Sequence, residues 1–222
     1  MVANESDQPI SATVIPGEPL PAAEEAPTLF AGKLIFWIPI VPLIALDLWS
    51  KTWAFALVTG KNAGQFSSQN DVAVFELSWV RFELVTWLNR GTIWGLGDQF
   101  HDYLKFLRVG AIALILYFVY KTASKHRWML LALGLILAGA IGNLYDNFFH
   151  FDDAYSTRPQ FAGAVRDFIH FFDPEVWNFP AFNVADSCIS VGAVSLFIAL
   201  WGLPNVESSD SAKVTANSSD GP

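Results

Sequence analysis

Four long runs of apolar residues punctuate the chain, at about 34–58, 103–120, 128–148 and 183–203. At ~1.5 Å per residue, a helix over each run is long enough to cross the ~30 Å hydrocarbon core of a bilayer. Pro39 and Pro42 fall in the first half of the first run, where they predict a kinked helix. The pattern therefore predicts an all-α membrane fold with four transmembrane helices.

Two segments between these runs have a different pattern. Residues 74–87 partly alternate between apolar and polar positions, as a half-buried strand does, which predicts a small extracytoplasmic β-sheet region at about 65–100. Residues 149–182 are rich in aromatic residues and are expected to form an outer loop. Within it, Trp177 and Phe179 are candidates for a lid over a site.

The composition supports a polytopic membrane protein, because 53% of residues are hydrophobic, only 15% are charged and the mean hydropathy is +0.36. The formal net charge of -8 comes mainly from the two ends, 1–33 and 204–222, which have the composition of disordered tails. An acidic surface for basic partners is therefore not indicated, and no nucleic acid is expected. The acidic leader lacks the basic region of a cleavable signal peptide, so the first apolar run should remain in the mature protein.

Basic residues fix the expected topology. Lys121, Lys125, His126 and Arg127 lie close together between the second and third apolar runs. By the positive-inside rule this loop is cytoplasmic. With four spans, both termini are then cytoplasmic, while the strand region and the 149–182 loop are extracytoplasmic.

Ionisable residues within or beside the apolar runs are the first functional candidates. Asp47 and Lys51, four residues apart, can form an ion pair on one helix face, which is either structural or part of a site. Gly139, Gly142, Asn143 and Asp146 share a helical stripe that suits either close helix packing with a polar contact or a substrate site.

Asp167 and Asp186 form the second candidate pair, since the topology places both on the same side of the membrane. A structural role is equally open: Asp186 can complement the helix dipole with Asn183 as the cap, and Asp167 can pair with Arg166. The single cysteine, Cys188, lies in an apolar run and is expected to serve packing.

Other catalytic arrangements are disfavoured. Ser50 and Lys51 are adjacent and would point about 100° apart on a helix, which argues against a Ser/Lys dyad. Gly95-Leu96-Gly97-Asp98 matches a presenilin-like signature, but it precedes Tyr145-Asp146, the reverse of the order in that family. The four histidines are scattered and no His-Glu-x-x-His run occurs, so a zinc protease lacks its ligands.

Taken together, residues 34–203 resemble the lipoprotein signal peptidase (signal peptidase II) family. The resemblance is carried by five blocks in the order of that family: Asp47-Leu-Trp-Ser-Lys51, Asn89-Arg-Gly91, Gly139-Ala-Ile-Gly142-Asn143-Leu-Tyr-Asp146, Val165-Arg-Asp167-Phe168 and Asn183-Val-Ala185-Asp186. It implies a multi-pass enzyme of the bacterial inner membrane with its active site near the extracytoplasmic face. The implied activity is cleavage of diacylglyceryl-modified prolipoproteins before the lipidated cysteine.

The resemblance also implies roles for residues. Asp167 and Asp186 correspond to the catalytic dyad of the family, while a larger set binds substrate or shapes the site: Asp47, Lys51, Asn89, Gly91, Gly142, Asn143, Asp146, Asn183 and Ala185. No metal or cofactor is implied. Membrane lipid is the expected surroundings, the protein is expected to be a monomer, and cyclic peptides of the globomycin type are possible inhibitors.

The chain departs from the family pattern in two places. Asn147 stands where the family usually has arginine, so a charge-assisted contact is either lost or supplied elsewhere, with Arg158 and Arg166 as candidates. Residues 148–163 form a longer segment than usual. Both departures bear on substrate preference and inhibitor sensitivity more than on the reaction.

Two rival functions differ in what they predict. A proton-coupled transporter would spread its acids through the depth of the membrane, whereas the acids here cluster at one end of the spans. A non-catalytic scaffold would lose stability, but no turnover, when either aspartate is replaced. If the pair is catalytic, two close carboxylates share one proton and activate a water molecule, without a covalent intermediate.

Overall fold

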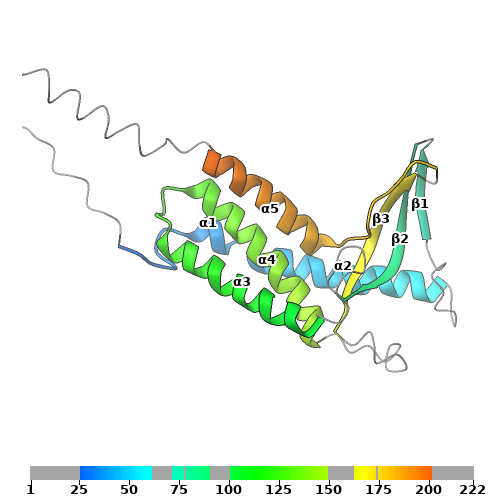
Figure 1. Ribbon diagram of the computed structural model, residues 1–222, viewed down its shortest axis with the longest axis horizontal. Coiled ribbons are helices and arrows are strands. Elements are labelled where there is room, and N and C mark those ends of the chain that lie inside the picture. Colours follow the sequence, from blue (N-terminus) through cyan, green and yellow to red (C-terminus); the bar gives the residue numbers. More distant parts are fainter. Residues whose placement is uncertain are drawn as a thin grey trace, which may run out of the picture.

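Helices lying along a common direction carry a small sheet at one end (Figure 1). The computed structural model describes residues 26–61, 72–77, 79–90, 101–149, 163–173 and 175–201. Its elements, in chain order, are α1 (Leu34–Trp37), α2 (Ile40–Lys61), β1 (Val72–Leu77), β2 (Val80–Asn89), α3 (His101–Lys121), α4 (Arg127–Phe149), β3 (Val165–Asp173), β4 (Trp177–Asn178) and α5 (Val184–Trp201). Among the described residues, four helical segments are long and apolar enough to cross a membrane, as predicted.

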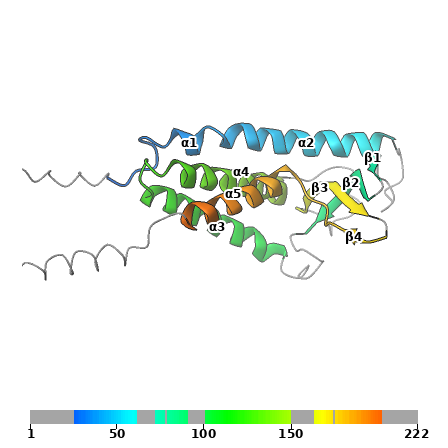
Figure 2. The ribbon, with the colours of Figure 1, turned by 90° about the horizontal axis from the view of Figure 1, so that it is seen from above.

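The first span is broken between α1 and α2, which confirms the predicted kink. Pro39 has no amide hydrogen and cannot continue the hydrogen-bond pattern of α1, while its carbonyl accepts from the Leu43 amide at 3.1 Å and opens the next turn. Beyond the break, α2 continues to Lys61 and runs alongside the sheet (Figure 2). One long helix therefore connects the membrane bundle with the sheet.

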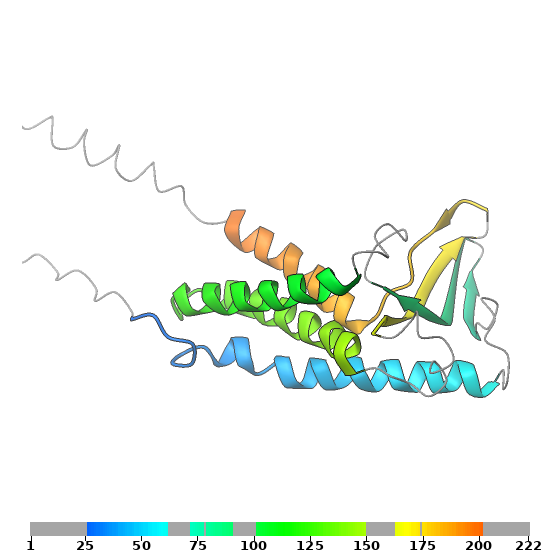
Figure 3. The same cartoon turned by 60° about the horizontal axis from the view of Figure 1, so that its bottom comes forward.

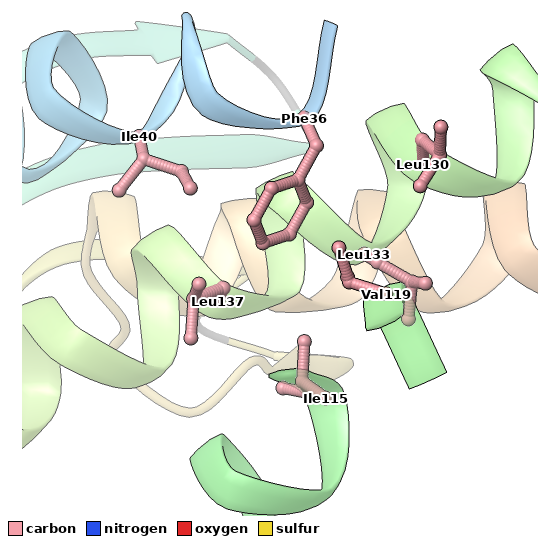
Figure 4. Close-up of a cluster of buried hydrophobic side chains, with 7 residues drawn as sticks. All are labelled: Phe36, Ile40, Ile115, Val119, Leu130, Leu133 and Leu137. Carbon is pink, nitrogen blue, oxygen red and sulfur yellow. The ribbon is translucent and has the colours of Figure 1, made fainter. Parts of the chain in front are cut away.

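The bundle is held by an apolar cluster at the end distant from the sheet (Figure 4). Its buried members come from α1, α2, α3 and α4: Phe36, Ile40, Ile115, Val119, Leu130, Leu133 and Leu137. Lys33, a residue that is 1% exposed, anchors the same end, because its ammonium donates to the Val119 carbonyl at 2.6 Å near the end of α3. A second cluster, with Phe55 and Val58 of α2 against Leu84 and Phe168 of the sheet, fixes the sheet on α2.

Small residues let α4 and α5 approach closely, as the predicted stripe requires. A Cβ added at Gly139 would collide with the carbonyl oxygen of Ala185, and one at Gly142 would come within 2.6 Å of the Asp47 carboxylate. α4 and α5 can therefore pack this closely only because glycine has no side chain at these positions. Because the obstacle at Gly139 is backbone, it cannot move aside as a side chain would.

This packing predicts that Gly139→Ala lowers the free energy of unfolding by about 1–3 kcal/mol, since the added methyl group must push α5 away. Gly110→Ala in α3 is the matched control. Nothing lies within 4 Å of its Cβ position, so that variant should be neutral or slightly stabilising. Denaturation of both purified variants in the same detergent compares them. Equal stability of the two would contradict the tight α4–α5 contact.

The sheet has four strands in the order β1-β2-β3-β4, all neighbours antiparallel (Figure 3). The prediction of a small sheet is therefore confirmed, in a different form. The alternating run at 74–87 is divided by a turn at Trp79 into β1 and β2. Moreover, β3 and β4 fall in the segment that was predicted to be an outer loop, so Asp167 lies on a strand and not in a loop.

A bulge in β2 lies beside Asp167. Leu84 pairs with Ile169, but the next partners are Trp87 and Asp167, so β2 has one residue more than β3 between them. Because side chains alternate between faces, this extra residue puts Trp87 and Asn89 on the face of Asp167, in place of Thr86 and Leu88. The irregularity thus brings an amide to the carboxylate.

Candidate active site

Lys51 is the centre of a buried ionic group where α2 meets α4. Its side chain is fully buried, and its ammonium contacts Asp47 Oδ2 at 2.7 Å and Asp146 Oδ2 at 3.1 Å, and donates to Asn143 Oδ1 at 3.0 Å. The predicted Asp47–Lys51 pair is therefore present, with a second carboxylate on the same cation. Buried charges of this kind are stable only when fully paired.

Arg166 neutralises the other side of Asp146. Its Nη2 and Nε donate to Asp146 Oδ1 at 2.7 and 3.2 Å, and its backbone amide donates to Oδ2 at 3.0 Å. The expectation that Arg166 pairs with Asp167 is wrong. Successive residues of a strand point to opposite faces, so a cation next to Asp167 in sequence is directed away from it.

The start of α5 holds Asp186 in a reciprocal capping arrangement. The Asp186 amide donates to Asn183 Oδ1 at 2.9 Å, and the Asn183 amide donates to Asp186 Oδ2 at 3.2 Å. This is a capping box, which satisfies amides that the first turn of a helix leaves free. The Ala185 amide donates to Asp47 Oδ1 at 2.8 Å, so α5 is also tied to the Lys51 group.

Asp167 is 2% exposed and accepts hydrogen bonds from two amides. Asn89 Nδ2 donates to its Oδ2 at 3.0 Å and Asn183 Nδ2 to its Oδ1 at 2.7 Å. Burial, and next the negative charge of Asp186, raise the pKa of Asp167 to about 7.

Two asparagines link the carboxylates of Asp167 and Asp186. Asn143 Nδ2 donates to Asp186 Oδ1 at 2.7 Å, and Asn183 Nδ2, which binds Asp167, also donates to Asn143 Oδ1 at 3.2 Å. Both asparagines are buried. The two acids are thus held from α5, α4 and the sheet in one hydrogen-bonded group, with Asp186 only half-buried.

The structure brings together nearly all the predicted site residues. The exception is Gly91, which lies outside the described residues, as do Asp98 and Arg158. The Ser50 hydroxyl donates to the Asp47 carbonyl of its own helix, at 3.0 Å, and not toward Lys51. In the part of the chain that the structure describes, no three His, Cys, Asp or Glu side chains could hold a metal ion together.

Arg108 is a neighbour of the site that the sequence did not reveal. It lies on α3, and its Nη1 donates to Asn147 Oδ1. The cation next to Asn147 is therefore Arg108, whereas Arg166 is engaged with Asp146. The only available signal was an arginine near the start of an apolar run, at the same end as the aspartates.

The raised pKa of Asp167 predicts a pH-dependent stability. Folded Asp167 holds its proton up to about pH 7, whereas an unfolded aspartate releases it near pH 3.9, so stability falls as the pH rises through this range. Asp167→Asn removes this loss. Relative to wild type, the variant should gain up to about 4 kcal/mol between pH 4 and pH 8. Denaturant unfolding at several pH values tests this, and a constant difference would contradict the assignment.

The helices and this group of acids, amides and cations define a multi-pass membrane protein with a polar site at one end of its spans. A family model for signal peptidase (SPase) II matches residues 39–202. The chain belongs to this family, and so it is a protease of the bacterial inner membrane.

Relatives agree with this assignment, and a solved structure agrees with the fold. The lipoprotein signal peptidase of Aquifex aeolicus (strain VF5) is 36% identical over 141 residues, 62% of this chain and 74% of that protein. The lipoprotein signal peptidase of Rhodopirellula baltica is 31% identical over 187 residues, 81% of this chain and 78% of that protein. A bacterial membrane enzyme solved by the in meso method at 1.9 Å aligns with a TM-score of 0.53 and 22% identity, covering 82% of this chain and 100% of that chain, which supports the fold alone.

Proposed function

We propose that the protein is an aspartic endopeptidase that removes signal peptides from diacylglyceryl-modified prolipoproteins, cutting before the lipidated cysteine. Asp167 and Asp186 are the proposed catalytic residues. The observation that supports this most is that two carboxylates share one network of amides, without a cation bonded to either among the described residues. Such a pair favours the singly protonated form that general acid and base catalysis needs.

The proposed reaction has one proton on the pair at rest. A pKa near 7 favours Asp167 as its holder, which leaves Asp186 ionised as the base. Asp186 takes a proton from a water molecule as the water oxygen attacks the scissile carbonyl carbon, and Asp167 gives its proton to the carbonyl oxygen. The tetrahedral intermediate then collapses: its C–N bond breaks, the amine takes the proton from Asp186, and a hydroxyl proton returns to Asp167.

The surrounding residues hold this geometry in the proposal. Asn143, Asn183 and Asn89 orient the carboxylates. Asn143 and Asn183 are also candidates for binding the substrate backbone. Lys51 and Arg166 neutralise Asp47 and Asp146 and so form a support behind them. Ala185 joins α5 to this support, and Gly142 leaves the space that the Asp47 carboxylate occupies. A role for Gly91 stays a prediction.

The orientation in the membrane is also part of the proposal. The start of α1 lies beside the basic loop that connects α3 and α4, since Ser124 Oγ donates to the Ala31 carbonyl at 3.1 Å. If that loop is cytoplasmic, the sheet and the aspartates are extracytoplasmic. A substrate with its acyl chains in the outer leaflet would then present its lipidated cysteine at the level of the pair.

Three further expectations from the sequence stay predictions: the lid with Trp177 and Phe179, a monomeric state and inhibition by cyclic peptides of the globomycin type. Trp177 and Phe179 are exposed in the structure.

Purified protein tests the proposed function on one prolipoprotein prepared with and without its diacylglyceryl group. We expect cleavage of the lipidated form only, with a released peptide that ends at the residue before the cysteine, as measured by mass spectrometry. An equal rate on both forms would disprove the substrate class. No cleavage of either form would disprove the function.

A further inference from the structure

We infer that Arg108 is a positioning residue of the active site. Its guanidinium is held near the site by a hydrogen bond to Asn147, and its positive charge favours the singly ionised form of the Asp167–Asp186 pair. This inference rests on the proposed function and extends it to a residue on α3. Its basis is the way the charges of the site are distributed among named contacts.

Arg108 is held in place by the side chain of Asn147. Asn147 is 3% exposed, and its Nδ2 donates to the Gly163 carbonyl at 2.7 Å, which fixes the orientation of the amide. The amide oxygen is thereby directed at Arg108 Nη1. Gly163 has a φ of 72°, and β3, with Asp167, begins two residues later. One amide thus connects α3, α4 and the strand that bears a catalytic acid.

The buried carboxylates behind the catalytic pair already have cations of their own. Lys51 is bonded to Asp47 and Asp146, and Arg166 is bonded to Asp146. Two cations therefore balance two buried carboxylates. What remains is the catalytic pair, whose hydrogen-bond donors among the described residues are all amides.

Arg108 completes this balance. Its guanidinium is only half-buried and donates to a neutral amide, so no carboxylate of the described residues is bonded to it. It nevertheless interacts electrostatically with Asp186, Asp167 and Asp146, most strongly, among these, with Asp186. With one proton on the pair, Asp47, Asp146, Asp167 and Asp186 together with Lys51, Arg166 and Arg108 have no net charge, which suits a site at the edge of a membrane.

The positive charge of Arg108 affects the ionisation of the Asp167–Asp186 pair. A nearby cation favours the charged form of a carboxylate, so Arg108 lets the pair lose its first proton at a lower pH. The other charged groups near the pair are Asp47 and Lys51 on α2, Asp146 on α4, Arg166 on β3, and Arg90, which follows Asn89 at the end of β2. Arg108 can be changed without breaking an ion pair to Asp47 or Asp146, because those carboxylates are bonded to Lys51 and Arg166.

The test compares the pH dependence of kcat/KM for cleavage of a lipidated prolipoprotein by three variants and wild type. Arg108→Gln keeps an amide donor for Asn147 and removes the charge. The double variant Arg108→Gln with Asn147→Arg supplies a guanidinium from α4 in place of the one lost from α3. Lys121→Gln, at the opposite end of α3, controls for the loss of a positive charge alone.

We expect Arg108→Gln to move the acid limb of the profile up by about one pH unit, with about tenfold lower kcat/KM below the limb. The double variant should return the limb toward wild type, and Lys121→Gln should leave it unchanged. An unmoved limb in Arg108→Gln, or a rate loss that Asn147→Arg does not restore, would overturn the inference. Wild type that cleaves nothing would instead disprove the proposed function.

Discussion

Replacing Asp186 or Asp167 by asparagine is expected to lower kcat by roughly 10³-fold or more, because each change removes a proton acceptor or donor that the reaction requires. The fold should survive. Asn183 still caps α5, and an asparagine at 186 can accept from the Asn183 amide as Asp186 does, at 3.2 Å in the wild type. Turnover of lipidated prolipoprotein at saturating substrate measures the loss.

Asp173→Asn is the matched control for this prediction. It makes the same chemical change on the same strand, at a residue whose carboxylate accepts from the Glu175 and Val176 amides in the β3–β4 turn. That variant should keep wild-type turnover to within a few-fold. A similar loss in all three variants would indicate that aspartate replacement damages the sheet, and would contradict a catalytic role.

Lys51→Met is expected to cause the largest loss of stability, about 3–5 kcal/mol. The change removes the ammonium that pairs with the buried carboxylates of Asp47 and Asp146. Arg166 still pairs with Asp146, but within the described residues Asp47 keeps only the Ala185 amide as a partner. The variant should therefore also loosen the start of α5, where Asp186 lies. Its turnover should fall for that reason.

Unfolding of Lys51→Met and Lys125→Met in one detergent measures this effect. Lys125 is exposed in the α3–α4 loop, and its replacement should change stability by no more than about 0.5 kcal/mol. If Lys51→Met is as stable as this control, the ion pairs do not support the site.

The helical part of the fold could be predicted because each membrane span must satisfy its own backbone and expose apolar residues to lipid. The break at Pro39 followed from the missing amide hydrogen. In contrast, β3 was missed because its partner, β2, lies far away in the sequence and because residues 165–173 do not alternate in polarity. Long-range pairing leaves no local pattern.

From the spacing of residues alone, contacts within the candidate site were predictable only where the residues share an element. The spacing of Asp47 and Lys51 was enough to predict their contact, and the stripe on α4 was enough to predict close packing. The partner of Arg166 could not be predicted, because the choice between Asp146 and Asp167 depends on which face of the strand the Arg166 side chain occupies. That face is known only once the register, including the bulge beside Trp87, is known.

The most direct test of the central claim compares cleavage of a lipidated prolipoprotein by wild type, Asp167→Asn, Asp186→Asn and the double variant, at matched thermal stability. If the two aspartates act as one unit, wild type releases the signal peptide, each single variant loses roughly 10³-fold or more, and the double variant loses no more than the worse single variant. Turnover close to wild type in either single variant, or losses that multiply in the double variant, would contradict a shared-proton aspartate pair.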